Sequence, residues 1–493
     1  MNLTSLHPSY SVYLDDWVTM SDCYRGERIV KAKGVTYLPA TPGQNADGME
    51  VNQKGWVNYQ AYKMRARFPD FVSQAVEALL GVMHRKPAVI ELPKKMEPLL
   101  EKATVRGESL QMLLRRINTS QLVTGRLGLL ADVPDGAPAD VLPYIATYDA
   151  QGILNWDDQD GDALLMTVLD ESGYVRKDMF EWENVKSARV LLMQDGVATM
   201  GVFTDNFDIT AMVAPSIAGR TLERLPFVIV NSKDIVPDPD DPPLMGLARL
   251  ALACYRGEAD YRQTLFMQGQ DTLVVIGGAG DEEIRAGAGA QISLGTGGDA
   301  KYIGVSGDGL EEMRLSIEND HAKAAEIGGQ LLAASDGNAE SGDALRIRVS
   351  ARTSSLNQIA LAGAGGLQTI LRTMAEWVGA DPEEVTVTPN LDFADDKLDG
   401  PTLVSFMTAK SLGAPLSKRS IHNLMRKREL TEMTYEEELA EIEQEEPEPT
   451  GGGDEVEGED TEGTPAGDTE EQEDEQEKKA DKTDRRTGKP AKD

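Results

Sequence analysis

Apolar residues at helical spacing and strand-like runs are mixed along the first third of the chain. Over residues 59–83 the apolar positions recur at intervals of three and four, which is typical of an amphipathic helix. Pro69 should kink or split this helix, because proline lacks the backbone N–H that a helix interior needs. A second helix is predicted over residues 109–122 and a buried strand over residues 127–133.

The first 48 residues show no comparable period. Tyr10, Tyr13, Trp17, Tyr24 and Tyr37 lie among charges and turn-forming residues, so the sequence predicts an irregular, aromatic-rich entry over residues 8–39. Residues 41–48 combine threonine, proline, glycine, asparagine and aspartate, which predicts a loop.

Residues 141–236 hold short β-like runs at 163–169, 188–193 and 227–230. Asp-Gly and Ser-Gly pairs between the runs are typical of tight turns, so this segment predicts a small β-rich module. The acidic, proline-dense stretch 237–243 ends the module and suits the first turn of a following helix. We therefore expect a boundary there.

Two long helices are predicted to bracket a second small β module. Apolar residues mark one helical face over residues 244–270, and the strand-like run 272–276 follows at once. Glycines crowd residues 277–309, which together with β-like pieces at 291–294 and 301–305 predicts a compact hairpin module. The second helix is expected over residues 309–334, and each helix should span on the order of 40 Å.

The remaining chain is predicted to be helical and then disordered. A polar loop at 335–343 precedes the longest helix, over 344–379, which has a basic start and a glycine cluster at 363–366 that invites a kink. A strand over 385–390 and helices over 401–412 and 417–430 follow, and 435–446 extends the helical pattern. Residues 447–493 have almost no apolar side chains and cannot bury enough surface to offset chain entropy.

Acidic residues dominate the charge of the chain. It has 83 Asp and Glu against 49 Lys and Arg, a formal net charge of -34. Residues 431–493 contain 25 acids and 7 bases, so residues 1–430 carry -16 of that total. This balance excludes a protein that holds duplex DNA by a continuous basic surface.

Cysteine content and hydropathy narrow the cellular setting. Cys23 and Cys254 are too few for a disulfide scaffold or a four-cysteine zinc site. No apolar run approaches the roughly 18–20 residues of a membrane span, and residues 1–9 lack a signal-peptide core. The expectation is a soluble protein made and used in a cytoplasm, with no membrane partner.

The motifs of common catalytic, cofactor and metal sites are missing, so the sequence predicts no catalytic residue, no cofactor and no metal. The string nearest to a phosphate-binding loop, Thr487-Gly488-Lys489-Pro490, lies in the acidic tail, and Gly287-Ala288-Gly289 lacks the dinucleotide-binding pattern. The acid pairs Asp157-Asp158 and Asp395-Asp396 are expected by chance in so acidic a chain. Four scattered histidines are interpreted as surface or helix-flank residues: His7, His84, His321 and His422.

The order of elements resembles that of the portal proteins of tailed bacteriophages: long helix, small β module, long helix, flexible loop, and a very long helix with a basic start. Short motifs make the chain similar to one portal-like family described mainly as a domain of unknown function, over roughly residues 7–430. These motifs are His7-Pro8-x-Tyr10, Trp17, Asp22-Cys23-Tyr24-x-Gly26-Glu27, Val30-Lys31-x-x-Gly34-x-x-Tyr37-Leu38-Pro39, Tyr62-x-x-Arg65-Ala66, Gly125-Arg126-x-Gly128, Pro143-Tyr144-x-x-x-Tyr148, Ile153-x-Asn155-Trp156 and Asp241-Pro242-Pro243-Leu244.

The resemblance implies an α+β portal fold. Residues 1–236 would form most of a mixed α/β wing, residues 244–270 and 309–334 the two stem helices, and residues 272–308 the clip that meets the packaging motor and the neck proteins. The remaining parts would be a tunnel loop facing DNA at 335–343, a long kinked helix and wing strand at 344–398, a helical crown at 401–435 and a disordered acidic tail at 447–493.

The resemblance also implies a function. Such proteins form a ring, usually of twelve subunits, at one capsid vertex of the virion, through which double-stranded DNA is packaged and ejected. They assemble in the cytoplasm of the bacterial host and do not hydrolyse ATP, which is the role of the terminase large subunit. The net acidity agrees, because an acidic wall repels a sliding duplex that a basic wall would trap.

The partners implied by the resemblance are further copies of the chain, double-stranded DNA, the terminase large subunit, the major capsid and scaffolding proteins, and head-completion or adaptor proteins. Candidates for terminase or neck contacts are Gly280, Asp281, Glu282, Glu283, Arg285, Gly297, Asp299 and Lys301. Candidates for the DNA channel are Ser335, Asp336, Asn338, Glu340, Ser341, Arg346, Arg348 and Arg352. The three arginines either contact DNA or pair with acids of a neighbouring subunit, whereas the charges over 309–334 are interpreted as a solvated or inter-subunit face.

Two alternatives belong to other classes. Another non-enzymatic phage head-assembly or connector protein would share the acidity but need not form a ring. An unrecognised hydrolase would lose turnover on mutation of one acid pair while its assembly stayed intact. The acidic tail is open to two interpretations, a solvated appendage or a docking segment for scaffold or capsid.

Overall fold

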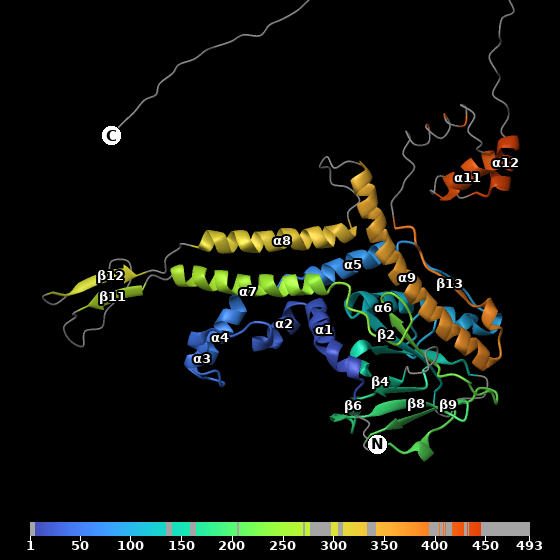
Figure 1. The fold of residues 1–493 in the computed structure, drawn as a ribbon, viewed down its shortest axis with the longest axis horizontal. Helices are drawn as coiled ribbons and strands as arrows, with labels where there is room; N and C mark the ends of the chain where they lie inside the picture. The colour runs from blue at the N-terminus through green and yellow to red at the C-terminus, as the bar shows by residue number, and fades with distance from the viewer. Residues whose placement is uncertain are drawn as a thin grey trace, which may run out of the picture. The chain divides into compact units, whose positions relative to one another are not determined.

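The computed structural model describes residues 5–134, 141–157, 164–204, 207–269, 272–276, 297–303, 309–332, 342–393, 417–427 and 433–444, with the single positions 404, 408, 410 and 431. Within these residues helices and strands are mixed, an α+β fold as expected (Figure 1). The chain divides into two compact units, Met1–Asp395 and Asp396–Asp493. Short 3-10 turns connect several elements: η1 (Gly34–Thr36), η2 (Lys94–Leu100), η3 (Ala150–Gly152), η4 (Ile209–Ala211) and η5 (Pro382–Glu384).

The N-terminal region is helical, so the irregular entry expected over residues 8–39 is wrong. Helix α1 (Pro8–Arg25) begins with a proline, whose missing N–H costs nothing in a first turn, and the His7 ring accepts a hydrogen bond from the Ser9 backbone N–H. Gly26, at φ +81°, ends α1 before α2 (Glu27–Ala32). The period is hard to read because aromatic side chains occupy both the buried positions and half-buried flanking ones.

The following helices mostly match their apolar periods. The loop expected over residues 41–48 instead contains α3 (Pro42–Ala46), because Thr41 and Gln44 form a reciprocal capping box. Helices α4 (Lys54–Arg65) and α5 (Phe71–Met83) confirm the predicted split near Pro69. Helix α6 (Leu110–Val123) starts as predicted, after the N-cap Ser109.

Antiparallel sheets follow α6. The first has the order β10 (Phe227–Asn231), β2 (Arg126–Asp132), β3 (Tyr144–Asp149). The second has the order β4 (Ile153–Asp157), β5 (Met166–Asp170), β8 (Ala188–Gln194), β9 (Val197–Phe203). The β-like runs predicted near residues 127, 163, 188 and 227 are thus confirmed as strands. Two pairs are separate sheets: β6 (Gly173–Arg176) with β7 (Trp182–Val185), and β1 (Val89–Glu91) with β13 (Thr386–Thr388).

Helix α9 (Gly342–Val378) packs its apolar stripe on the first sheet and on α6. Glycines 363–366 lie inside the continuous helix, so they do not split it. They allow close packing instead: a Cβ at Gly366 would lie 2.3 Å from Val230 Cγ2, and one at Gly363 would lie 2.6 Å from Asn118 Nδ2. The fully buried residues of α9 are Leu367, Ile370, Leu371, Met374, Ala375 and Trp377.

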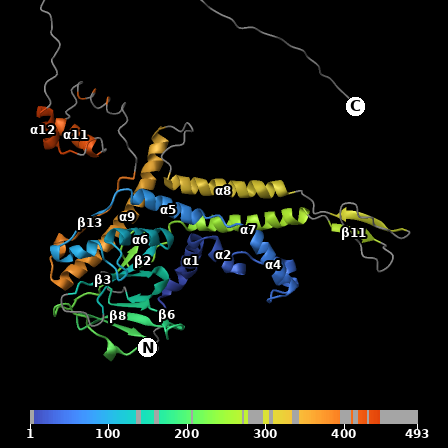
Figure 2. The ribbon, with the colours of Figure 1, turned by 180° about the vertical axis from the view of Figure 1, so that it is seen from behind.

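Helix α7 (Met245–Gln268) and helix α8 (Leu310–Leu332) lie side by side in both views, with β11 (Thr272–Ile276) and β12 (Asp299–Ile303) beyond their common far end (Figures 1 and 2). Strands β11 and β12 pair antiparallel. The two predicted long helices and the strands at 272–276 and near 301–305 are therefore confirmed, while the β-like piece at 291–294 lies outside the described residues. Residues 237–243 lie inside the first compact unit and do not divide it.

The second unit contains two described helices, α11 (Lys418–Lys427) and α12 (Tyr435–Gln444). The buried His422 ring of α11 lies 5.4 Å from the Tyr435 ring. Of the helix expected over 401–412, only positions 404, 408 and 410 are described, and all three are helical. The acidic tail, 447–493, lies outside the described residues.

Candidate functional site

The pair of long helices is the most distinctive feature of the first unit. We call α7, α8, β11 and β12 the arm. Each arm helix is roughly 35 Å long at 1.5 Å per residue, and the chain runs out along α7 and returns along α8 (Figures 1 and 2). Gly257 of α7 lets the helices approach, because a Cβ there would lie 3.4 Å from Ile317 Cγ1 of α8.

The two arm helices differ in burial: α8 buries few of its apolar side chains, whereas α7 buries residues from Met245 to Ala259. Among residues 310–327 of α8, the buried ones are Ile317 and Ala324, two turns apart on the side facing α7. Large apolar side chains elsewhere on both helices are 38–45 % exposed: Leu265, Phe266 and Met267 near the end of α7, and Met313, Leu315 and Ile327 on α8. A helix pair with this pattern has apolar surface left for a further helix to cover.

Ion pairs on the exposed side of α8 are local. Arg314 pairs with Glu311 and Glu318, and Lys323 lies 3.7 Å from Asp320, all within the same helix. Exposed pairs at this spacing contribute little to stability, because solvent and salt screen them. This agrees with the interpretation of the charges over 309–334 as a solvated face.

The structure describes three of the eight candidates for terminase or neck contacts. Gly297, Asp299 and Lys301 are exposed, and in the register of the hairpin Asp299 lies opposite Ile276 and Lys301 opposite Val274. The structure thus places these three residues together beyond the tip of the helix pair. Gly280, Asp281, Glu282, Glu283 and Arg285 lie outside the described residues.

The channel candidates are mostly outside the described part of the chain. Ser335, Asp336, Asn338, Glu340 and Ser341 fall in the segment between α8 and α9 that is not described. Arg346, Arg348 and Arg352 belong to the first turns of α9, and positions 348 and 352 are one helical turn apart.

Several of the sequence motifs meet in space, which the sequence alone did not reveal. The Trp156 ring has His7 stacked at 3.9 Å and the buried Arg126 guanidinium at 4.1 Å, so three motifs form one cluster. Tyr37 donates a 2.8 Å hydrogen bond to Asp22 within the α1–α2 region. Gly125, at φ +75°, passes close to the Asp240 backbone, because a Cβ there would lie 3.1 Å from the Asp240 carbonyl oxygen. Through these contacts the motifs connect segments that are separate in the sequence.

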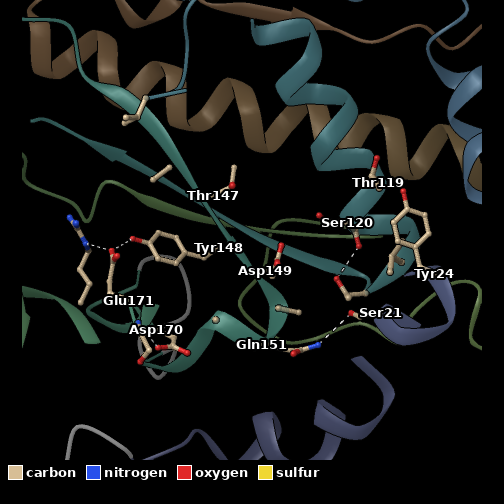
Figure 3. A pocket seen from close by; sticks show the side chains of 18 of the residues that line it. Ser21, Tyr24, Thr119, Ser120, Thr147, Tyr148, Asp149, Gln151, Asp170 and Glu171 are labelled. Carbon is tan, nitrogen blue, oxygen red and sulfur yellow. Dashed lines mark hydrogen bonds and ion pairs between the residues drawn. The ribbon is translucent and has the colours of Figure 1, made fainter. Parts of the chain in front are cut away.

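A polar cavity of about 700 Å³ lies between α1, α6, β3 and the end of β5, and Figure 3 shows its lining. On its wall, Arg189 donates 2.7 Å hydrogen bonds to Glu171 and to Asp132. Tyr148 donates to the same Glu171, as Figure 3 shows, and Tyr144 donates to Asp132 at 2.9 Å. The network connects the two larger sheets, and sequence reasoning missed it because its members come from three separate strands and the loop after β5.

The pKa shifts within this network keep each of its tyrosines and Arg189 in one protonation state at neutral pH. Burial raises the pKa of Tyr144 to about 12, and burial followed by the hydrogen bond to Glu171 raises the pKa of Tyr148. Burial opposes the charge of Arg189, but Tyr148, Asp132 and Glu171 outweigh it and raise the pKa of that guanidinium. Both phenols therefore stay protonated at neutral pH, and the arrangement acts as a clamp between the sheets.

The histidines and cysteines are dispersed. His7 caps the start of α1 and His84 follows the end of α5, so these two are helix-flank residues as interpreted. Burial raises the pKa of the Cys23 thiol to about 12 and that of the Cys254 thiol to about 11.

Within the described residues, no group of three or more His, Cys, Asp or Glu is placed to hold a metal ion. No helix in the same part of the chain is both long and apolar enough to cross a bilayer.

Comparison with known proteins gives one sequence match. Residues 243–378, which include the arm and all of α9, match the family described as "Domain of unknown function (DUF4055)". The match covers less than a third of the chain. No curated protein matches.

Two similar solved structures are chains of particle necks. One, "Neck of native GTA particle computed with C12 symmetry", is 14% identical with a TM-score of 0.35. The other, "Neck of empty GTA particle computed with C6 symmetry", is 15% identical with a TM-score of 0.36. Each alignment covers 72% of this chain and 89% of the other. Scores this low do not establish a common fold.

Proposed function

We propose that this chain is a head–tail connector protein of a tailed phage, and within that class the portal protein. Copies would form a ring at one capsid vertex, and double-stranded DNA would pass through its channel during packaging and ejection. The chain would hydrolyse no ATP itself, and the terminase large subunit would supply the motor. Its other partners would be the major capsid and scaffolding proteins and the head-completion or adaptor proteins.

The arm is the observation that carries the proposal. Two helices of 24 and 23 residues leave the body together and hold a two-stranded sheet beyond their ends. Their outward apolar side chains are exposed in the single chain, and a ring of parallel arms would cover them with the arms of both neighbours. The family match over residues 243–378 falls on this same part of the chain, and nearly all of the portal-like motifs of the sequence lie before it.

The acidity of the chain supports a conduit for DNA. The net charge is -34, of which residues 1–430 carry -16, so the chain would repel the phosphates overall and a duplex would slide past it without being held. In this proposal the exposed Asp299 and Lys301 at the arm tip belong to the terminase or neck contact. Arg346, Arg348 and Arg352 would face DNA or the acids of a neighbouring subunit.

Electron microscopy of the purified full chain, with mass determination in parallel, tests the proposal. The expected result is a ring of roughly twelve copies with a central channel wide enough for a duplex. A compact closed dimer, or a chain that stays monomeric when its scaffolding protein is added, would contradict it. Reversing the charges of Arg348 and Arg352 then tests DNA contact: intact rings with normal packaging would exclude that role for both arginines.

A further inference from the structure

The hairpin of β6 and β7 exposes an unusual concentration of large apolar side chains. We call residues 173–185 the aromatic hairpin. Tyr174 is 71%, Phe180 84% and Trp182 61% exposed, and Val175 and Met179 are exposed as well. On the order of 400 Å² of apolar side chain is uncovered, as much as the largest patch on a typical monomer and packed into one small hairpin.

The aromatic hairpin is a separate two-stranded sheet. Among the described residues its strands pair only with each other, so neither outer edge has a strand partner there. Tyr174 and Trp182 project from one face and Val175 and Glu183 from the other, and all of them are exposed. Because an isolated two-stranded hairpin is at best marginally stable in water, a surface that covers this one would stabilise it.

A groove of matching character lies elsewhere on the same unit. We call it the basic groove: it has a volume of about 690 Å³ and lies where the ends of α4 and α7 meet α2. Apolar side chains, including the 74% exposed Met64 and the 38% exposed Phe266, line its floor. The Arg65 guanidinium lies 3.6 Å from the centre of the Phe266 ring, which fixes that ring in place.

The groove and the hairpin each carry an exposed charge of opposite sign. The groove is lined by Lys31, Arg65, Arg67, Arg262 and Glu27, of which Lys31 pairs with Glu27, and Arg262 pairs with Glu258 of the same helix. The hairpin contains three acids, Asp178, Glu181 and Glu183, and two bases, Arg176 and Lys177, and Lys177 lies 3.5 Å from Glu181. The side chains of Arg67 and Glu183 are exposed, and within the described residues neither forms an ion pair.

The two surfaces cannot meet within one chain. In both views α1 and α2 lie between β6 and α4, on the same side of the arm (Figures 1 and 2). The extensive contacts of β6 and β7 within the described residues are with each other. A hairpin and a socket at separate places on one subunit are the requirement for a head-to-tail interface, which repeats around a closed ring.

We propose that the aromatic hairpin of one subunit inserts into the basic groove of the next copy of this chain. Phe180 and Trp182 cover Met64 and Phe266, and Glu183 of the hairpin pairs with Arg67. This inference rests on the ring of the proposed function and adds to it a second contact, which joins the aromatic hairpin to the ends of α4 and α7.

Assembly of the full-length protein at graded concentrations, measured by mass photometry, tests this contact. Phe180→Ser with Trp182→Ser, and separately Met64→Ser with Arg67→Glu, should each raise the concentration for half-assembly at least about tenfold, as expected for buried aromatic anchors. Val202→Ser, at a 53% exposed position of β9, is the matched control and should change that concentration less than about twofold. All substituted residues are exposed, so circular dichroism should show unchanged folding.

A charge exchange tests the pairing itself. Glu183→Arg alone and Arg67→Glu alone should weaken assembly, and the chain carrying both should regain it. Wild-type rings with unaffected variants would overturn the hairpin contact and leave the proposed ring standing. Loss in both single variants without recovery in the double variant would overturn the pairing, as would loss of DNA retention by Arg67→Glu with normal assembly. A wild-type chain that forms no ring with its scaffold would instead refute the proposed function.

Discussion

The α9 core and the arm use helices of the same kind in opposite ways. The α9 core, formed by α6, β2, β10 and the second half of α9, buries every large apolar side chain of its long helix from Leu367 to Trp377. Helix α8 of the arm buries Ile317 and Ala324 and exposes Met313, Leu315 and Ile327. The difference indicates that α9 is stabilised within one chain, whereas the arm reaches its full stability in an assembly.

Trp377→Ala should produce the largest effect and sharpen this comparison. Trp377 is fully buried and donates a 3.2 Å hydrogen bond to the Arg220 carbonyl oxygen. Removing its ring leaves a cavity and deletes this hydrogen bond, so the free energy of unfolding should fall by about 3–5 kcal/mol. Urea unfolding followed by circular dichroism measures it, and a loss below about 1 kcal/mol would mean that the α9 core is less tightly packed than the burial of Trp377 indicates.

The adjacent glycines of α9 offer a matched pair of variants. A Cβ at Gly366 meets the buried Val230, so Gly366→Ala should cost about 1–3 kcal/mol. A Cβ at Gly365 has nothing within 4 Å, so Gly365→Ala should raise stability by up to about 1 kcal/mol, because alanine favours a helix. Thermal unfolding of the two variants should shift in opposite directions, and equal shifts would show that packing against Val230 is not the cause.

Leu315→Ser tests the other side of the comparison. Leu315 is 45% exposed on α8, so its replacement should change the free energy of unfolding of the dissociated chain by no more than about 0.5 kcal/mol. The same substitution should weaken assembly at a fixed protein concentration, since the arms are expected to pack together. Sedimentation velocity measures assembly, and an unchanged oligomer would break the proposed contrast between the two regions.

A pH effect at His84 is the smallest one expected. Burial lowers the pKa of His84 below its ordinary 6.5, while its Nε2 lies 2.9 Å from Asn118 Oδ1 in a hydrogen bond. Below about pH 6.5 the unfolded chain therefore binds a proton that the folded chain resists, so stability is lost as the pH falls toward the folded pKa. Unfolding of wild type and His84→Gln at pH 7.5 and 5.5 should show a smaller loss in the variant, and parallel losses would exclude His84 as a source.

Local sequence signals predicted the long elements well. Helices α5 to α9 and strands β2, β8 and β10 appear where the apolar periods place them, because each has a buried face wide enough to set its own period. Helix α1 was missed because its buried face is made of Tyr10, Trp17 and Met20 among half-buried tyrosines. The close packing at Gly363 and Gly366 was not predicted, because it depends on the residues opposite them.

The same distinction applies to the candidate sites: those built from one continuous segment were predicted, and those built from distant segments were not. The sequence located the arm and the strands at its tip, since these follow from local patterns along one continuous segment. It did not locate the Arg189 network, the His7–Trp156–Arg126 cluster or the basic groove. Their members are separated by tens to hundreds of residues, so no local spacing could indicate them.

The sequence by itself determined the positions of the long helices α5 to α9, the order of these elements and the sign of the charge, because these depend on neighbouring residues. Tertiary structure alone decided which apolar surfaces are covered within the chain and which are left open. Burial depends on what packs opposite a side chain: Val230 meets Gly366 in the α9 core, while the aromatic hairpin and the outer side of α8 meet nothing in the described residues of their own chain.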